Sequence, residues 1–229
     1  MTARIGDSLR GRRVLLTQAN EFMGPALRDA FAAYGADVIA DDRSLADPAG
    51  AEAAVAAAGR VDVLLVNLAV PAPSTRATDV GDDEWRHVFA HLVDPMPRLF
   101  RAVLPQMISR RAGKIVVMGS ATALRGQKRT STYAAARGAQ LSYVRAVGVE
   151  VAPDNVQVNL IAQNFVENPT YYPPQVQQLP AFQERLRREV PIGRLATAQE
   201  DAQFAVFLAS SEVDFFVGQS FAFAGGWIG

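Results

Sequence analysis

The chain has 229 residues, with 23 basic and 23 acidic side chains and no cysteine. Without cysteine there is no disulfide framework, no cysteine-ligated zinc or iron–sulfur site and no thiol nucleophile. A formal net charge of zero argues against a nucleic-acid binder that relies on its overall charge.

Short apolar runs alternate along the chain with amphipathic or alanine-rich stretches, and we interpret the runs as strands. Strands are predicted at residues 13–17, 36–40, 61–66, 114–118, 156–162 and 219–224. Helices are predicted at residues 24–34, 49–58, 82–110, 131–151, 181–189 and 199–210. We expect kinks in the long helix at its prolines, Pro95, Pro97 and Pro105. A loop rich in proline and tyrosine covers residues 164–179.

Fully apolar strands that alternate with helices are typical of a parallel sheet covered on both faces. We therefore predict an α/β fold, a doubly wound, Rossmann-like parallel sheet in a single domain spanning residues 1–229. Ligands bind to such sheets beyond the carboxyl ends of the strands. The loops of interest accordingly begin at Thr17, Asn67, Ser120 and Gln163.

No targeting or membrane segment is predicted. The apolar run Val14-Leu15-Leu16 is too short for a signal-peptide core. Residues 61–70 are interrupted by Asp62 and Asn67, and they have about half the length that a membrane-spanning helix needs. We therefore expect a soluble cytoplasmic protein.

A serine, a tyrosine and an arginine form the pattern that carries the chemistry. Ser120 follows the strand at residues 114–118, Tyr133 comes thirteen residues later, and Arg137 lies four residues beyond Tyr133. Positions i and i+4 share one face of a helix. Alone, this pair would be read as a core tyrosine beside a solvated arginine. The serine at the strand end favours a functional site.

This pattern resembles the short-chain dehydrogenase/reductase superfamily over nearly the whole chain. The resemblance includes residues 100–107, the turn at residues 193–195 and the terminal Ala-Gly-Gly at residues 224–226. In those dehydrogenases a lysine that also holds the nicotinamide ribose stands at the position of Arg137. The only lysines of this chain, Lys114 and Lys128, are not placed to substitute for it.

The turn after the first strand departs from the superfamily's nucleotide loop, Thr-Gly-x-x-x-Gly-x-Gly. Gln18 and Phe22 replace two of its glycines, and Gly24 alone is kept. Because those glycines let the backbone approach a pyrophosphate, we expect the two side chains to fill that space. Glu21 adds a negative charge where a phosphate would be attracted.

The rest of the nucleotide-binding half is also altered. The family's Asn-x-Ala-Gly is Asn67-Leu68-Ala69-Val70 here. Only one clear helix fits between the second and third predicted strands, where the superfamily usually has two. Asp41 and Asp42 stand where a ribose-binding acid is expected, but with the phosphate loop blocked we interpret both as solvated turn residues.

A Ser-Tyr-Arg set beside a blocked nucleotide loop is similar to the halohydrin dehalogenases, or haloalcohol halide-lyases. The resemblance implies that vicinal haloalcohols close to epoxides with loss of halide, without a cofactor, and that small anions reopen epoxides. Tyr133 is the expected base, Arg137 the cation that favours its phenolate, and Ser120 the residue that holds the substrate oxygen.

The family's halide site lies in an aromatic-rich loop, which in this chain follows the strand predicted at residues 156–162. We expect backbone N–H groups and aromatic edges to hold the halide. The candidate residues, with Phe22 as a pocket wall, are Gln163, Asn164, Phe165 and Tyr172. Loop packing is the alternative interpretation of Phe165 and Tyr172. Gln163 stands where some members have proline, which leaves the halide contacts open.

Two other functions are compatible with the sequence. One is an NAD(P)-dependent short-chain oxidoreductase with a degenerate nucleotide loop. The other is an inactive member that serves as an interaction module, against which the intact Ser120, Tyr133 and Arg137 argue.

The expected partners are a small haloalcohol or epoxide and a halide or other small anion, with no nucleic acid and no membrane. His87 and His91 have zinc-like spacing but no third ligand follows, so no metal site is predicted. Resemblance to the superfamily implies a homotetramer, a dimer of dimers, with residues 82–110 and 131–151 between the subunits.

Overall fold

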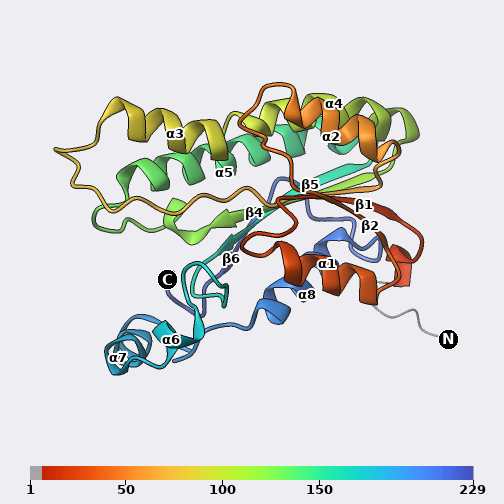
Figure 1. The fold of residues 1–229 in the computed structure, drawn as a ribbon. Coiled ribbons are helices and arrows are strands. Elements are labelled where there is room, and N and C mark those ends of the chain that lie inside the picture. Colours follow the sequence, from red (N-terminus) through yellow and green to blue (C-terminus); the bar gives the residue numbers. More distant parts are fainter. Residues whose placement is uncertain (1–6, 229) are drawn as a thin grey trace.

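A computed structural model describes residues 7–228. Their strands form one parallel sheet in the order β2-β1-β3-β4-β5-β6 (Figure 1). The strands are β1 (Arg13–Thr17), β2 (Asp37–Asp41), β3 (Val63–Val66), β4 (Gly113–Ser120), β5 (Val156–Gln163) and β6 (Ser220–Phe223). The predicted fold class, a Rossmann-like parallel sheet, is confirmed.

Helices cover both faces of the sheet. On one face lie α2 (Gly50–Ala58), α3 (Asp82–Leu92), α4 (Pro95–Arg110) and α5 (Ser131–Val151), and on the other lie α1 (Gly24–Ala33) and α8 (Ala198–Ala209) (Figure 1). Two further helices, α6 (Pro174–Gln177) and α7 (Pro180–Glu189), project from the sheet as a lobe at the lower left of Figure 1. None of the helices in the described residues is long and apolar enough to span a membrane.

The apolar strands supply two separate cores because successive side chains of a strand point to opposite faces. In β3, Leu64 and Val66 pack with the helices α2 to α5, whereas Val63 and Leu65 pack with α1 and α8. A third cluster, built around Phe165, joins the α7 lobe to the end of the chain. The all-apolar strands are therefore explained by burial on both faces.

The long helix predicted at residues 82–110 is two helices, so that prediction is wrong in detail. The first ends at Leu92 and the second begins at Pro95. Proline lacks a backbone N–H and is tolerated in the first turn of a helix, where that group has no intrahelical partner. Pro95 and Pro97 therefore start a new helix, and only Pro105 lies inside one.

The order of strands sets the position of the crevice. After β2 the chain returns through α2 alone, and β3 pairs directly with β1 on the side opposite β2. The expectation of a single helix between these strands is confirmed. The sheet order reverses between β1 and β3, and the loops that leave these strands diverge there, which opens a crevice.

Candidate functional site

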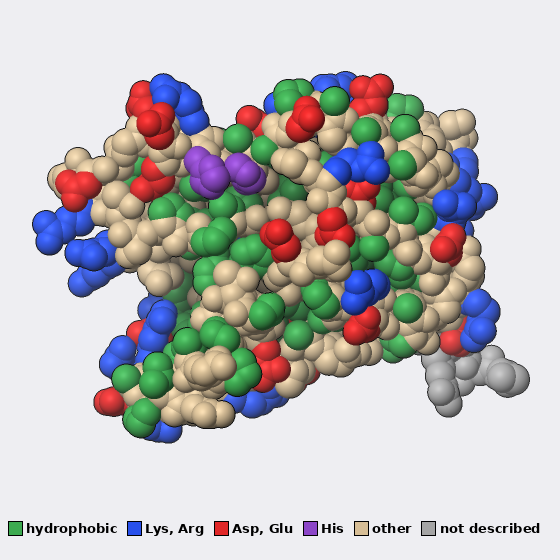
Figure 2. All heavy atoms as spheres, in the orientation of Figure 1, with side chains coloured by type: hydrophobic (Ala, Val, Ile, Leu, Met, Phe, Trp, Pro, Cys, Tyr) green, Lys and Arg blue, Asp and Glu red, His purple; other side chains and the backbone are tan. Residues whose placement is uncertain are grey.

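A cavity of about 280 Å³ lies beyond the carboxyl ends of the central strands. Its lining includes all eight residues that the sequence analysis assigned to the site: Phe22, Ser120, Tyr133, Arg137, Gln163, Asn164, Phe165 and Tyr172. In Figure 2 the surface is hollowed at the left, between the α6–α7 lobe and the loops that precede α3 and α5.

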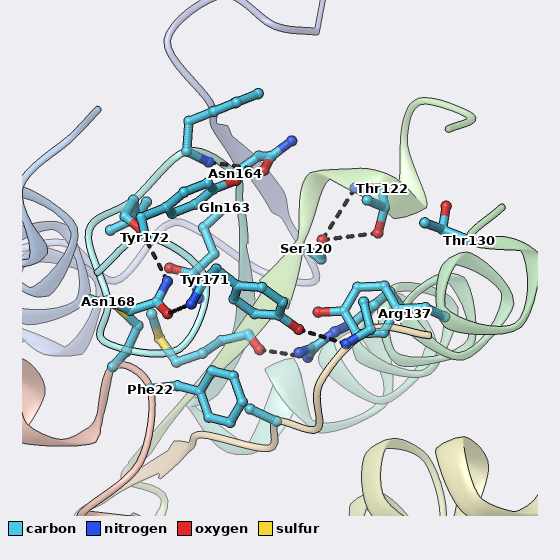
Figure 3. Close-up of a pocket in the computed structure, with 18 of the residues that line it drawn as sticks. Phe22, Ser120, Thr122, Thr130, Arg137, Gln163, Asn164, Asn168, Tyr171 and Tyr172 are labelled. Carbon is cyan, nitrogen blue, oxygen red and sulfur yellow. Dashed lines mark hydrogen bonds between the residues drawn. The ribbon is translucent and has the colours of Figure 1, made fainter. Parts of the chain in front are cut away.

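Ser120 is fixed by the strand that it ends. It lies beside Gln163 in the register of β4 and β5, and its extended backbone leads into a short 3-10 turn at Ala121–Ala123. Its Oγ accepts a hydrogen bond from the Thr122 N–H at 3.3 Å and shares another with the Thr122 hydroxyl at 2.9 Å (Figure 3). Thr122 was missed by the sequence analysis, although it lines the same cavity.

Arg137 is a buried cation with fixed geometry, only 4% exposed. Its Nη1 donates to the Met118 carbonyl at 3.1 Å and to Gln140 Oε1 at 2.9 Å. Its guanidinium carbon lies 5.0 Å from the centre of the Tyr133 ring. The interpretation of Arg137 as a solvated helix residue is therefore excluded.

A glutamate outside the predicted site holds the start of the helix that carries Tyr133. Glu84 on α3 accepts a hydrogen bond from the Thr132 hydroxyl at 2.7 Å and another from the Thr75 hydroxyl at 2.5 Å. Glu84 thus ties the first turn of α5 to the segment after β3. Sequence reasoning missed Glu84, because only the folded chain brings α3 beside α5.

The loop after β1 is closed by one of its own side chains. Gln18 Oε1 accepts a hydrogen bond from the Ala69 N–H at 2.6 Å, and Gln18 Nε2 donates to the Ala69 carbonyl at 3.3 Å. The Asn67 amide donates to the carbonyls of Gln18 and Glu21, at 2.9 and 3.0 Å. The loops after β1 and β3 are therefore joined across the crevice.

These residues do not fit a dinucleotide. The Gln18 side chain spans the gap that a pyrophosphate would need, and the Phe22 ring lies in the cavity, 5.7 Å from the Tyr171 ring. A Cβ on the one remaining glycine, Gly24, would lie 2.5 Å from the backbone of Ala19. Gly24 is therefore required for packing of the loop.

The two aspartates after the second strand differ from each other. Asp41 is 6% exposed, ends β2, and accepts hydrogen bonds from Arg43 Nε at 2.7 Å and Arg43 N–H at 3.1 Å. Its interpretation as a solvated turn residue is wrong, because the strand runs one residue further than predicted. Asp42 is exposed and accepts hydrogen bonds from Asn20 at 2.9 and 2.5 Å.

The aromatic residues after β5 surround the far end of the cavity. The Phe165 ring stacks on Tyr172 at 6.0 Å and meets Trp227 edge-on at 6.1 Å, while the Arg185 guanidinium lies 5.2 Å from the Phe165 ring centre. Burial is the main cause that raises the pKa of the Tyr172 phenol. Phe165 also has a left-handed backbone, with φ of 55°.

Three backbone N–H groups that were expected to hold a halide have other partners. Asn164 N donates to the Phe223 carbonyl at 3.1 Å, Phe165 N to Asn164 Oδ1 at 2.9 Å, and Tyr172 N to the Asn168 carbonyl at 3.1 Å. That part of the expectation is wrong for these residues. The aromatic edges and the side-chain amides remain, and Gln163 Oε1 is buried without a hydrogen-bond partner.

Tyr171 is a further cavity residue that the sequence analysis did not assign. Its hydroxyl accepts a hydrogen bond from the Ala72 N–H at 2.9 Å and donates to the Val70 carbonyl at 3.1 Å (Figure 3). Burial raises the pKa of the Tyr171 phenol, and the neighbouring Tyr133 raises it further.

The histidine pair lies on the surface of α3, away from this cavity (Figure 2). The rings of His87 and His91 are 4.3 Å apart, and His91 Nδ1 lies 2.8 Å from the His87 carbonyl. Within residues 7–228 no group of three or more histidine, aspartate or glutamate side chains is placed to hold a metal ion.

Comparison with known proteins finds reductases and dehalogenases. A family model described as enoyl-(acyl carrier protein) reductase matches residues 8–228. The 3-oxoacyl-[acyl-carrier-protein] reductase FabG of Salmonella typhimurium is 28% identical over 245 residues, covering 96% of this chain and 98% of the relative.

Two similar solved structures are described as dehalogenases. A structure described as a dehalogenation enzyme is 28% identical, with a TM-score of 0.88 over 96% of this chain and 99% of that one. Halohydrin dehalogenase HheC, bound to ethyl (2S)-oxiran-2-ylacetate, is 27% identical, with a TM-score of 0.85 over 93% of this chain and 96% of that one. Sequence identity to the FabG reductase and to the two dehalogenase structures is nearly equal, so it does not distinguish reduction from dehalogenation. The residues of the site have to distinguish them.

Proposed function

The chain belongs to the short-chain dehydrogenase/reductase superfamily, and from this premise we propose that it is a cofactor-independent halohydrin dehalogenase. The observation that carries the proposal is the closed loop after β1. Gln18 there uses its side-chain amide to join Ala69 across the crevice where superfamily reductases need open backbone. The reaction is the closure of vicinal haloalcohols to epoxides, and its reversal opens epoxides with small anions.

The buried charge of Arg137 supports the same reaction. Among residues 7–228 no carboxylate lies within ion-pair distance of its guanidinium, and its Nε has no hydrogen-bond partner. A buried cation is costly unless an anion compensates it. The proposed reaction places two such anions in the cavity in turn, the phenolate of Tyr133 before the proton transfer and the departing halide after it.

The chemical step needs a base, a positioned oxygen and a place for the halide. Tyr133, as phenolate, takes the proton of the substrate hydroxyl. The oxygen attacks the neighbouring carbon, a carbon–oxygen bond forms, and the carbon–halogen bond breaks with its electron pair leaving on the halide. Ser120, oriented by Thr122, donates a hydrogen bond to the substrate oxygen.

The halide leaves toward the aromatic end of the cavity. The positive edges of the Phe165, Tyr172 and Phe22 rings favour an anion there. Because the nearby backbone N–H groups are already bonded, the side-chain amides of Gln163 and Asn164 are the proposed donors. The same donors would receive azide or cyanide in the reverse direction.

Halide release tests this function directly. The purified protein, with no cofactor added, is incubated with vicinal chloro- and bromoalcohols, and both free halide and epoxide are measured. We expect both products in equal amounts. Ser120→Ala should slow the release strongly. The control is Tyr143→Phe, which should not slow it: Tyr143 lies on the same helix as Tyr133, but its ring packs against Phe100 of α4. Absence of both products across the panel contradicts the proposal.

Ligand-induced melting shifts separate this function from that of a nucleotide-dependent reductase. We expect NAD and NADP to leave the melting temperature unchanged and bromide or azide to raise it saturably. A nucleotide present at 100 times its dissociation constant would stabilise the fold by about 2.7 kcal/mol, which is readily measured. A clear shift with NADP and none with bromide would favour the reductase.

A further inference from the structure

We propose that Tyr171 is a positioning residue for this reaction, whose hydroxyl holds that of Tyr133 and donates a hydrogen bond to it when Tyr133 becomes a phenolate. The proposal rests on the proposed function only for the reaction that Tyr133 serves. The arrangement of the two hydroxyls is independent of the substrate.

The position of the Tyr171 hydroxyl is fixed from several sides. Its chain segment follows β5, yet its oxygen is bonded to Ala72 N at 2.9 Å and to the Val70 carbonyl at 3.1 Å, both in the segment after β3. Its ring lies 5.7 Å from Phe22 and 6.3 Å from Tyr172. Figure 3 shows the side chain reaching across the cavity toward Arg137.

Tyr133 is a neighbour of this hydroxyl: both tyrosines line the same cavity, and Tyr133 is close enough to raise the pKa of the Tyr171 phenol. A tyrosine hydroxyl has one proton to donate and can also accept. The Ala72 N–H occupies one accepting position of Tyr171, and its proton goes to the Val70 carbonyl. The oxygen of Tyr133 is the second acceptor in our proposal.

The charge of Tyr133 selects between these two acceptors. While Tyr133 is neutral, its own O–H can point to Tyr171, whose proton stays on the Val70 carbonyl. Hydrogen bonds to an ionised acceptor are roughly twice as strong as those between neutral groups. Once Tyr133 loses its proton, rotation of the Tyr171 O–H toward the phenolate is therefore favoured. This rotation stabilises the base without moving a heavy atom.

Tyr171 stays a donor throughout this cycle. Burial is the main cause that raises the pKa of its phenol, followed by the neighbouring Tyr133. The charge of Arg137 opposes that rise. In the proposed cycle Tyr171 therefore keeps its proton and serves as the donor, and Tyr133 is the acceptor.

Tyr171→Phe tests the proposal, because it removes one oxygen and keeps the ring. We expect kcat at neutral pH to fall about tenfold, KM to change little, and the acidic limb of the pH–rate profile to move up by about one unit, or about 1.4 kcal/mol. Tyr143→Phe, an equal change packed against Phe100, should leave the profile unchanged. A loss of rate that is uniform across pH would indicate loop positioning only and overturn the proposal.

A spectroscopic titration decides the matter without any substrate. Phenolate absorbance is followed against pH in the wild type and in Tyr133→Phe, and the difference isolates Tyr133. The same subtraction is made for Tyr171→Phe and the double variant Tyr133→Phe/Tyr171→Phe. The midpoint of the Tyr133 titration should lie about one pH unit higher there than in the wild type. No displacement overturns the role of Tyr171. A displacement in a protein that releases no halide refutes the dehalogenase function and leaves the tyrosine pair intact.

Discussion

Arg137 shows how a single residue connects the fold to the proposed chemistry. Its guanidinium donates to Met118 in β4 and to Gln140 one turn along α5, and Gln140 in turn donates to the Leu92 carbonyl at 2.6 Å. These contacts hold a planar, permanently charged group over the Tyr133 ring. An arginine held in this way supplies charge but cannot relay a proton.

Arg137→Lys should therefore impair the enzyme although it keeps the charge. A lysine ammonium is compact and flexible, and it cannot reproduce both hydrogen bonds and the contact with the Tyr133 ring. We expect halide release to fall by roughly ten- to a hundredfold, from the loss of about 1.5–3 kcal/mol of charged hydrogen bonding. The pH–rate profile should change shape, and no NADPH oxidation should appear with carbonyl substrates. An unchanged profile counts against the electrostatic role.

Tyr133→Phe should nearly abolish ring closure while the fold remains. The substitution removes only the proton acceptor, and general base catalysis contributes roughly 10²–10⁴-fold to such rates. Halide release under saturating haloalcohol is the measurement, with circular dichroism as the check on folding. Residual activity within tenfold of the wild type would exclude Tyr133 as the base.

At the scale of elements, the site is held by ties between segments that are distant in sequence. Gln18 joins the loops after β1 and β3, and Tyr171 joins the loop after β5 to that after β3. Glu84 on α3 joins α5 to the segment after β3. The segment between β3 and α3 takes part in all three, so it is the common wall of the cavity.

Glu84→Gln should loosen this wall. The amide keeps one oxygen but replaces the other with a donor, so one of the two threonine hydroxyls loses its acceptor. We expect a loss of roughly 1 kcal/mol in unfolding free energy, or about 2–4 °C in melting temperature, and a lower kcat because Thr132 precedes Tyr133. Glu52→Gln, on the exposed face of α2, is the control. Equal behaviour of both variants would contradict this role.

Sequence reasoning works for elements whose pattern is local, and fails where tertiary contacts decide. The strands around Leu64 and Val116 were predictable because burial on both faces leaves an unbroken apolar run. The Ser120, Tyr133 and Arg137 set was predictable from spacing. Glu84 and Tyr171 were not, because their partners lie 48 and about 100 residues away and no local pattern encodes them.

On the scale of the whole molecule, one buried charge should govern the response to pH. Asp201 on α8 is fully buried, and neither carboxylate oxygen has a hydrogen-bond partner among residues 7–228. Burial raises its pKa from 3.8 to about 7. Since the folded state holds the proton more tightly than the unfolded chain, its stability is full below about pH 4 and falls as the pH rises through 7.

Asp201→Asn should therefore stabilise the protein at alkaline pH. Above pH 7 the buried Asp201 carboxylate is ionised, which costs the folded state at most roughly 4 kcal/mol of stability. The neutral amide avoids this cost. Chemical denaturation at pH 8 should show a clear gain over the wild type, and the gain should shrink as the pH approaches 4. A gain that does not vary with pH would mean that the carboxylate charge is not its cause.

The homotetramer and the single-domain organisation stay predictions, which sedimentation and limited proteolysis can test.

The backbone of the loop after β1 has, at two positions, a conformation that favours glycine. Gln18 and Phe22, which replace glycines of the nucleotide loop, have φ of 45° and 49°, in the left-handed region that glycine enters without steric cost. The backbone at these two positions would therefore accept glycine without changing its path. Removal of these two side chains would reopen this part of the crevice without rebuilding of the loop after β1. A protein engineer could start from Gln18→Gly and Phe22→Gly, because each substitution relieves the steric strain of a side chain in the left-handed region.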